Sequence, residues 1–204
     1  AGIATLESGI IKEVKCEGRV DALEQNLSKQ KLEGNIGIGH VRWATHGVPS
    51  TVNAHPHSSD KVSVVHNGII ENSTILKKLL IKKGYVFKSQ TDTEVIAHLI
   101  TEYLKKNDLK NSIIKMLKRV HGSFALGIIF QDQPDLIVGA RRGSPLAVGY
   151  GPKENYLGSD SYALKSMTNK VTYLDDSEFC IIKKDNVEFF DEKGNKVNKK
   201  VLEL

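Results

Sequence analysis

Apolar residues recur every three or four positions in four segments of the chain, and this spacing predicts helices. The four segments are residues 20–32, 72–84, 91–106 and 108–122. In the second segment, Asn72 or Ser73 can cap the start of the helix and Gly84 marks its end. The apolar face of that helix consists of Ile75, Leu76, Leu79 and Leu80. The third segment begins with Thr91 and Glu94, which have the spacing of a capping box.

Shorter runs rich in Val, Ile and Phe predict β-strands in the remaining segments. Residues 1–18 are typical of a hairpin that turns at Glu7-Ser8-Gly9. Further strands are expected within residues 35–47, 123–130, 136–141, 144–151, 155–160, 179–184 and 187–191. Helices do not alternate regularly with these strands, so a parallel doubly wound sheet is disfavoured. The pattern favours an α+β fold in which antiparallel sheets carry helices on their outer faces, in one domain of residues 1–204.

Residues 62–72, with the sequence VSVVHNGIIEN, interrupt an apolar run with His-Asn-Gly. Asn67-Gly68 between apolar segments is a strong signal for a two-residue hairpin turn. A second interpretation is chemical, because a glycine lets the backbone approach a ligand closely. A backbone N–H beside an asparagine amide is also a common pair of donors for a developing oxyanion. Spacing alone leaves both interpretations open.

Composition narrows the class of protein. With 204 residues, of which 40% are apolar, the chain can bury a core of ordinary size. The net charge of +5 comes from lysines spread over the predicted helices and the carboxyl end, which disfavours nucleic-acid binding. No apolar run is long enough to span a membrane and residues 1–14 lack the layout of a signal peptide, so we expect a cytoplasmic protein. Cys16 and Cys180 are too few for a disulfide framework.

Polar residues of the kinds that build binding sites gather in four segments, which are residues 39–47, 53–57, 66–72 and 89–94. A free amino acid presents a carboxylate and an ammonium group, so its site needs an arginine for one and an acid for the other. Arg42 and Asp92 carry those charges. Each residue also has a structural interpretation, Arg42 as a charge at a strand end and Asp92 as a first-turn acid favoured by the helix dipole.

The hypothesis of a metal site comes from four histidines, His46, His55, His57 and His66. In an extended His-Pro-His segment the imidazoles of His55 and His57 point to opposite sides, and Pro56 prevents a helix from bringing them together. No acidic residue lies at a spacing typical of zinc ligands. The sequence therefore favours hydrogen-bonded structural histidines over metal ligands.

Five motifs in a fixed order carry a resemblance to a known family. They are GHVRWATHG, NAHPH, VVHNGIIEN, SQTDTEVIAHL and ARRGSPLAVG. In this order they resemble the glutaminase domains of glutamine–fructose-6-phosphate transaminases (isomerizing), a branch of the class II glutamine amidotransferases. The resemblance covers residues 1–204. It implies a four-layer αββα sandwich of the N-terminal nucleophile class, and a reaction that needs no metal or organic cofactor.

The resemblance also implies a reaction and partners. In the family, L-glutamine is hydrolysed to glutamate and ammonia. Sugar-phosphate isomerase domains then use the ammonia to convert fructose 6-phosphate to glucosamine 6-phosphate, and the full-length protein is expected to form a homodimer. The alternatives are a non-catalytic fragment that binds glutamine or docks onto those domains, and the glutaminase domain of another class II amidotransferase.

Individual residues match the functional positions of the family. Asn67 and Gly68 match its oxyanion hole. Arg42 matches the residue that binds the α-carboxylate of glutamine, and Asp92 matches the residue that binds its α-ammonium group. The remaining matches are Trp43 to a gate for ammonia, Thr45 and His46 to a loop that closes over the substrate, and His55 to a nearby loop.

One element of the family is not matched. The nucleophile of the family is an amino-terminal cysteine, followed by a strand, a helix and an Arg-Gly-Tyr-Asp-Ser stretch. Ala1 and Gly2 match the residues after that stretch, and neither Cys16 nor Cys180 matches the nucleophile. Residues 1–204 are therefore expected to lack the nucleophile and the isomerase domains, and to be inactive alone.

Overall fold

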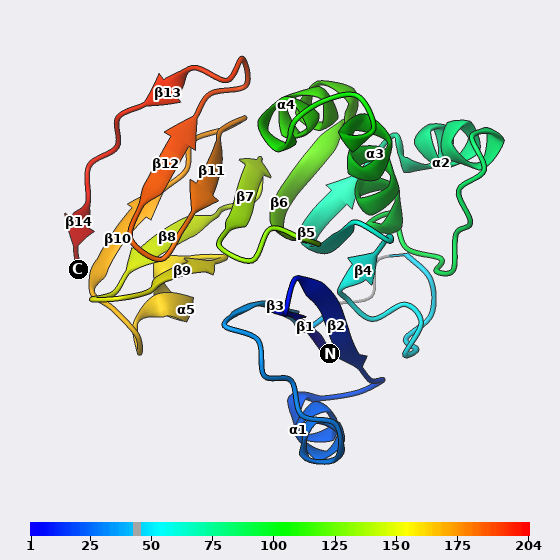
Figure 1. The fold of residues 1–204 in the computed structure, drawn as a ribbon, viewed down its shortest axis with the longest axis horizontal. Helices are drawn as coiled ribbons and strands as arrows, with labels where there is room; N and C mark the ends of the chain where they lie inside the picture. Colours follow the sequence, from blue (N-terminus) through cyan, green and yellow to red (C-terminus); the bar gives the residue numbers. More distant parts are fainter. Residues whose placement is uncertain (43–45) are drawn as a thin grey trace.

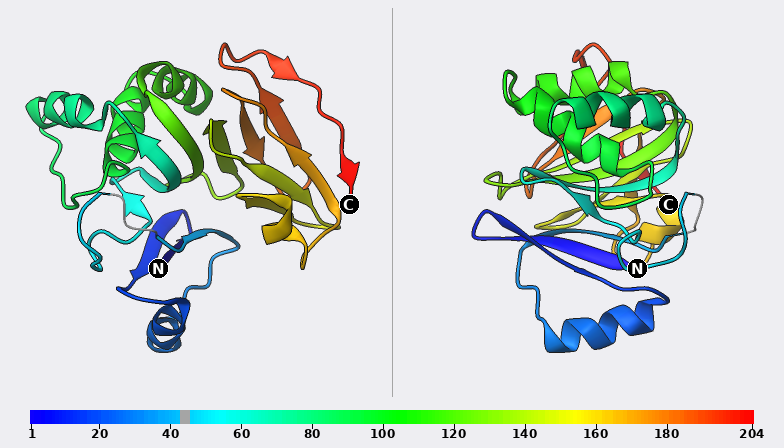
Figure 2. Two further views of the ribbon diagram at one scale, coloured as in Figure 1. Left: turned by 180° about the vertical axis from the view of Figure 1, so that it is seen from behind. Right: turned by 90° about the vertical axis from the view of Figure 1, so that its right-hand side faces the viewer.

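The structure of the chain is a computed structural model, which describes residues 1–42 and 46–204. The described strands form three sheets, in which the pairings are antiparallel. Three helices cover one face of the largest sheet, and the two smaller sheets pack on its other face (Figure 2). Further helices lie outside the smaller sheets. This arrangement confirms the predicted α+β sandwich.

The amino-terminal part of the chain forms the smallest sheet. Its elements are β1 (Gly2–Glu7), β2 (Ile10–Lys15), β3 (Ile36–His40) and the covering helix α1 (Val20–Lys29). Ser8 and Gly9 both have positive φ, 51° and 77°, as a type I′ turn requires, so the predicted hairpin is confirmed. β3 pairs with the free side of β1 and ends at His40, so the strand expected within residues 35–47 is shorter than predicted.

The large sheet crosses the middle of the molecule (Figure 1). In order across the sheet its strands are β13 (Lys196–Val197), β12 (Val187–Phe190), β11 (Phe179–Ile182), β7 (Ile137–Arg142), β6 (Gly122–Phe130), β5 (Val62–Ile70) and β4 (His57–Ser58). The central pair β5–β6 runs in continuous register from Val62 opposite Phe130 to Ile70 opposite Gly122. Alternate residues of these strands therefore face the helices and the smaller sheets.

The third sheet comes from the carboxyl half of the chain. Its elements are β8 (Ala147–Tyr150), β9 (Asn155–Gly158), β10 (Lys170–Tyr173), β14 (Leu202–Glu203) and the short helix α5 (Ser161–Leu164). β8 and β9 lie where the sequence predicts strands. The sequence patterns did not predict β10 and α5, which have 4 residues each.

The main core lies between the large sheet and three helices, α2 (Ser73–Lys82), α3 (Glu94–Leu104) and α4 (Leu109–Arg119). Ile96, Ile100 and Phe124 are fully buried in this core. The Asp108 carboxylate accepts a hydrogen bond of 2.8 Å from the Asn111 N–H and caps α4. Among the described residues, no helix has the length and apolar content that crossing a bilayer requires.

The predicted apolar face of α2 is only half correct. Leu76 and Leu80 are buried, but Ile75 and Leu79 are 63% and 38% exposed. α2 lies at the periphery beside α3 (Figure 1), so a narrow stripe of its surface meets the core. The predicted side-chain cap is wrong as well, because the Asn72 side chain bonds the backbone of Arg119 and His121.

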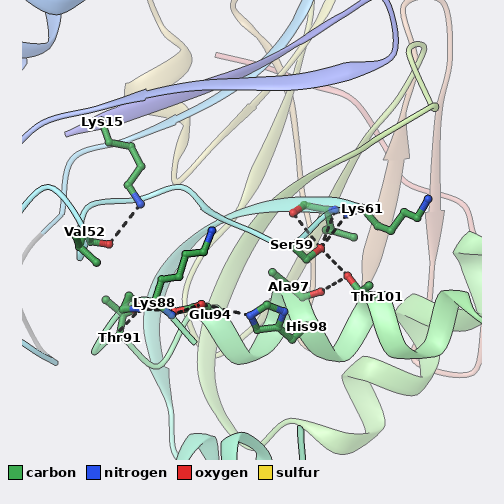
Figure 3. Close-up of polar contacts among 12 residues, drawn as sticks. Lys15, Val52, Ser59, Lys61, Lys88, Thr91, Glu94, Ala97, His98 and Thr101 are labelled. Atoms are coloured by element: carbon green, nitrogen blue, oxygen red, sulfur yellow. Dashed lines mark hydrogen bonds and ion pairs between the residues drawn. The ribbon is translucent and has the colours of Figure 1, made fainter. Parts of the chain in front are cut away.

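The predicted capping box of α3 is wrong, although the helix is present. The Glu94 carboxylate accepts hydrogen bonds from the backbone N–H groups of Lys88 and Ser89, at 2.8 and 2.7 Å. His98, one turn further along the helix, contacts the same carboxylate at 3.3 Å (Figure 3). Burial raises the pKa of Glu94, but these hydrogen bonds outweigh it and lower the pKa to about 2. Glu94 thus fixes the loop that precedes α3, including Ser89.

The Asn67-Gly68 pair lies inside β5, so the hairpin interpretation is wrong. Asn67 pairs with Ala125 and Gly68 with Phe124 of β6. Gly68 has a φ of 112°, which residues with a Cβ rarely adopt. A Cβ there would also overlap the Ser123 carbonyl group. The glycine therefore permits a local distortion of β5 against β6, and the strand continues to Ile70.

This geometry predicts that Gly68→Ala destabilises the fold by about 2–5 kcal/mol, from the unfavourable φ together with the overlap with Ser123. Gly18→Ala is the matched control, because Gly18 has a φ of 95° and nothing within 4 Å of its absent Cβ. We expect that control to lose about 1–2 kcal/mol. Chemical denaturation of both variants measures the difference, and equal losses would contradict a steric role of Ser123.

Candidate active site

A cavity of about 910 Å³ opens where the three sheets meet. The ends of β3 and β5 border it, together with β9 and the segment just before α3. The residues predicted from sequence that line it are Arg42, His55, Asn67, Gly68 and Asp92. Residues of all five motifs therefore line one space, with Leu146 from ARRGSPLAVG, although the motifs are distant in sequence. The predictions for Trp43 and Thr45 lie outside the described residues.

Asn67 and Gly68 are both exposed to the cavity. The side-chain oxygen Oδ1 of Asn67 lies 2.7 Å from Nε2 of His40, the last residue of β3. An asparagine that accepts a hydrogen bond through Oδ1 keeps both N–H donors of Nδ2 for another partner. Asn67 thus offers the Nδ2 donor, and Gly68 has no Cβ that would block a group approaching its backbone.

Asp92 is buried, with 5% of its surface exposed. Its Oδ2 accepts a hydrogen bond of 2.7 Å from the backbone N–H of Ile70, at the end of β5. Its Oδ1 lies 3.8 Å from Nδ1 of His46. The hydrogen bond with the Ile70 N–H fixes the carboxylate at the wall of the cavity. Ile70 is three residues after Asn67 in β5. An anion held there attracts a cationic group of a ligand.

Arg42 follows β3 and is held by the loop that comes after it. Its guanidinium group donates hydrogen bonds to the carbonyl oxygens of His46, Gly47 and Val48, the last two at 3.2 and 3.3 Å. The half-buried side chain still lines the cavity. The structure therefore brings Arg42 and Asp92 to one space, as the amino-acid hypothesis requires.

That loop is joined to the segment before α3 by two amide side chains. Asn53 donates to Val48 and to the Oε1 of Gln90, at 2.9 and 3.0 Å, and accepts from the Gln90 N–H at 2.9 Å. The sequence assigns no role to either residue beyond its motif, NAHPH for Asn53 and SQTDTEVIAHL for Gln90. The structure shows that Asn53 is buried, and buried amides are usually hydrogen-bonded, but nothing in the sequence indicates its partner.

Histidines line one side of the cavity. The ring of His55 stacks on His40 at 4.2 Å and meets the edge of His57 at 4.9 Å. The sequence places His55 and His57 on opposite sides only if their segment is extended, and that condition is not met, because residues 54 and 55 form a bend and the two rings meet. His55 Nδ1 accepts from the His66 N–H at 3.3 Å, and Thr93 Oγ1 contacts Nδ1 of His66 at 2.9 Å.

Burial dominates the electrostatics of these rings. It lowers the pKa of His55 strongly, that of His57 to about 3 and that of His66 to about 4. The three imidazoles are therefore neutral near pH 7. Among the described residues, no group of three or more His, Cys, Asp or Glu side chains is placed to hold a metal ion. His40, His66 and Thr93 join this network without having been assigned a role in catalysis from the sequence.

Comparison with known proteins connects this cavity to a family. Residues 40–166 match the family model described as a glutamine amidotransferase domain. The glutamine–fructose-6-phosphate aminotransferase (isomerizing) of Mesorhizobium japonicum is 52% identical over 202 residues, which are 98% of this chain and 33% of that protein. The protein of the same name from Caldanaerobacter subterraneus is 50% identical over 206 residues, 100% of this chain and 34% of that protein.

A solved structure extends the comparison to the fold. The glutamine phosphoribosylpyrophosphate amidotransferase of B. subtilis superposes with a TM-score of 0.76 and 27% sequence identity. The match covers 96% of this chain and 43% of that one. The chain spans about a third of the length of the curated relatives that it matches.

Proposed function

Because this chain belongs to the family of glutamine amidotransferase domains, we propose that residues 1–204 form a single glutaminase domain, which binds L-glutamine and promotes hydrolysis of its side-chain amide. The observation that carries the proposal is the placement of Arg42, Asp92 and the Asn67-Gly68 pair on one cavity. Arg42 complements the α-carboxylate of glutamine and Asp92 its α-ammonium group. The side-chain amide of glutamine then lies against Asn67 and Gly68.

The nucleophile in this proposal is a cysteine thiol from a segment other than residues 1–204. Cys16 packs in the core beneath α1, and Cys180 is buried in the core between two sheets. Burial raises the pKa of the Cys180 thiol to about 12, so this thiol is protonated near pH 7. No cysteine is among the described residues that line the cavity. The chain thus supplies binding groups and oxyanion donors.

The proposed reaction proceeds in two steps. The α-amino group of the cysteine takes the thiol proton while the sulfur forms a bond to the amide carbon. The carbonyl electron pair moves to oxygen, where Asn67 Nδ2 and the Gly68 N–H stabilise the negative charge, and it then returns to re-form the C=O bond. The C–N bond breaks, and the α-amino group of the cysteine passes a proton to the departing ammonia. Water then cleaves the thioester and releases glutamate. No metal or organic cofactor takes part.

Two strand edges support a position for the missing nucleophile. β3 is the last strand of the smallest sheet and β9 is the last strand of the third sheet. Both border the same cavity, and Val65 and Gly127 of the large sheet line it as well. We propose that the segment that carries the nucleophile pairs antiparallel with the edge of β3, because unpaired strand edges bind another strand. Its first residue would then reach the end of β3, near His40.

The partners follow from the relatives, and we propose them on that basis. The names of those relatives identify fructose 6-phosphate as the acceptor, and their remaining two-thirds lies outside this chain. We propose that sugar-phosphate isomerase domains occupy that length and convert fructose 6-phosphate to glucosamine 6-phosphate with the released ammonia. The full-length protein is proposed to form a homodimer in the cytoplasm.

The binding role of Asp92 predicts that Asp92→Asn weakens glutamine binding by about 2 kcal/mol or more, because the ammonium group loses its charged partner. Asparagine still accepts from the Ile70 N–H, so the melting temperature should change little. Calorimetry in the full-length protein, with its nucleophilic cysteine replaced by alanine, measures the affinity. Asp21→Asn on α1 is the control. Equal losses of affinity and stability in Asp92→Asn would point to a structural role.

The oxyanion role of Asn67 is the test of the proposed activity. Asn67→Asp replaces a donor with a negative charge, so we expect kcat for ammonia release by the full-length protein to fall by about 10²–10³-fold or more. Binding of glutamine should persist, because Arg42 and Asp92 are unchanged. Asn198→Asp, at an exposed site outside the cavity, is the control. Wild-type turnover in Asn67→Asp would overturn the proposed function.

A further inference from the structure

The amide of Asn67 has two chemically opposite ends. Nδ2 donates hydrogen bonds and stabilises an oxyanion, whereas Oδ1 accepts them and repels one. The two ends occupy nearly the same volume, so the shape of the cavity alone does not select between them. The hydrogen-bond partner at one end of the amide therefore decides which end faces the substrate.

His40 makes that contact, with Nε2 at 2.7 Å from Oδ1 of Asn67. We propose that His40 is a positioning residue that holds Asn67 with its Nδ2 donors toward the cavity, an inference that rests on the proposed function. A ring nitrogen that carries a proton attracts Oδ1 and repels Nδ2. One imidazole proton therefore sets the polarity of the side-chain half of the oxyanion hole.

The surroundings of His40 favour the N–H on Nε2, because Nδ1 is buried and has no hydrogen-bond partner among the described residues. Burial lowers the pKa of His40 overall, which favours the neutral ring with a single N–H. The hydrogen bond with the Asn67 side chain acts in the opposite direction and raises the pKa of His40. Protonation at low pH would keep the N–H on Nε2, so the contact does not depend on a titration.

The ring of His40 is fixed in place by a chain of contacts that reaches α3. It stacks on His55 with centroids 4.2 Å apart and an angle of 18° between the planes. His55 in turn contacts the His66 N–H through Nδ1 and Thr93 Oγ1 through Nε2, at 3.3 and 3.4 Å. Thr93 follows Asp92 directly, so the ammonium-binding end and the oxyanion end of the site share one support.

Two substitutions separate the donor of His40 from its ring. His40→Phe keeps an aromatic ring for stacking on His55 and removes the N–H donor. His40→Gln removes the ring and keeps an N–H donor of similar reach. We expect kcat of the His40→Phe full-length protein to fall about tenfold or more, up to the 10²–10³-fold loss of one oxyanion donor. KM for glutamine should not change, because the donor acts on the transition state. His40→Gln should retain most of kcat.

The order of the two variants decides the inference. If His40 only supports the stack, His40→Gln will lose more activity than His40→Phe, and that result overturns the proposal. Wild-type kcat in His40→Phe also overturns it. In the Asn67→Ala background, His40→Phe should cause no further loss, because the two residues act as one unit. Wild-type turnover in Asn67→Ala alone would instead overturn the oxyanion hole, and with it the proposed function, whatever His40 does.

Discussion

The close approach of two backbones at Gly68 and Ser123 is the constraint on which the site depends. A side chain at position 68 would overlap the Ser123 carbonyl, so β5 passes this point only as glycine with a φ of 112°. The strand then continues, which places Asn67 on the cavity and Ile70 at its end. The Ile70 N–H holds Asp92 at 2.7 Å. A single strand thus sets the relative positions of the proposed oxyanion donors and of the acid for the substrate ammonium group.

The second feature of the site is a pair of opposite charges, Arg42 and Asp92, at a cavity that is also lined by neutral histidines. Arg42 and Asp92 come from segments on either side of β5, yet they line one cavity. The imidazoles of His55 and His66 line the same cavity, and burial lowers their pKa values, so these rings carry no charge near pH 7. The proposed zwitterionic ligand would therefore meet two charges that backbone hydrogen bonds already hold in place, Arg42 through the carbonyls of the following loop and Asp92 through the Ile70 N–H. The buried cysteines Cys16 and Cys180 are not among the described residues that line the cavity.

Sequence patterns predicted the long elements well and the local contacts poorly. α3 and α4 were evident from periodicity, and the first hairpin from Ser8-Gly9. The Asn67-Gly68 signal suggested a turn because local propensity cannot register that β6 continues beside both halves of the run. Glu94 was assigned to a capping box because its backbone partners, Lys88 and Ser89, belong to a loop whose path no spacing rule describes. For the site, the charges of Arg42 and Asp92 could be identified from the sequence. The proposed role of His40 could not, because it depends on a contact with Asn67 that forms only where β3 meets β5.

A crystal structure of the full-length protein with L-glutamate bound tests the central claim most directly. The account predicts the α-carboxylate within hydrogen-bonding distance, about 3 Å, of Arg42 and the α-ammonium group at the same distance from Asp92. The γ-carboxylate should then lie against Nδ2 of Asn67 and the N–H of Gly68. Glutamate bound elsewhere, or bound with its α-groups toward Asn67, would contradict the account.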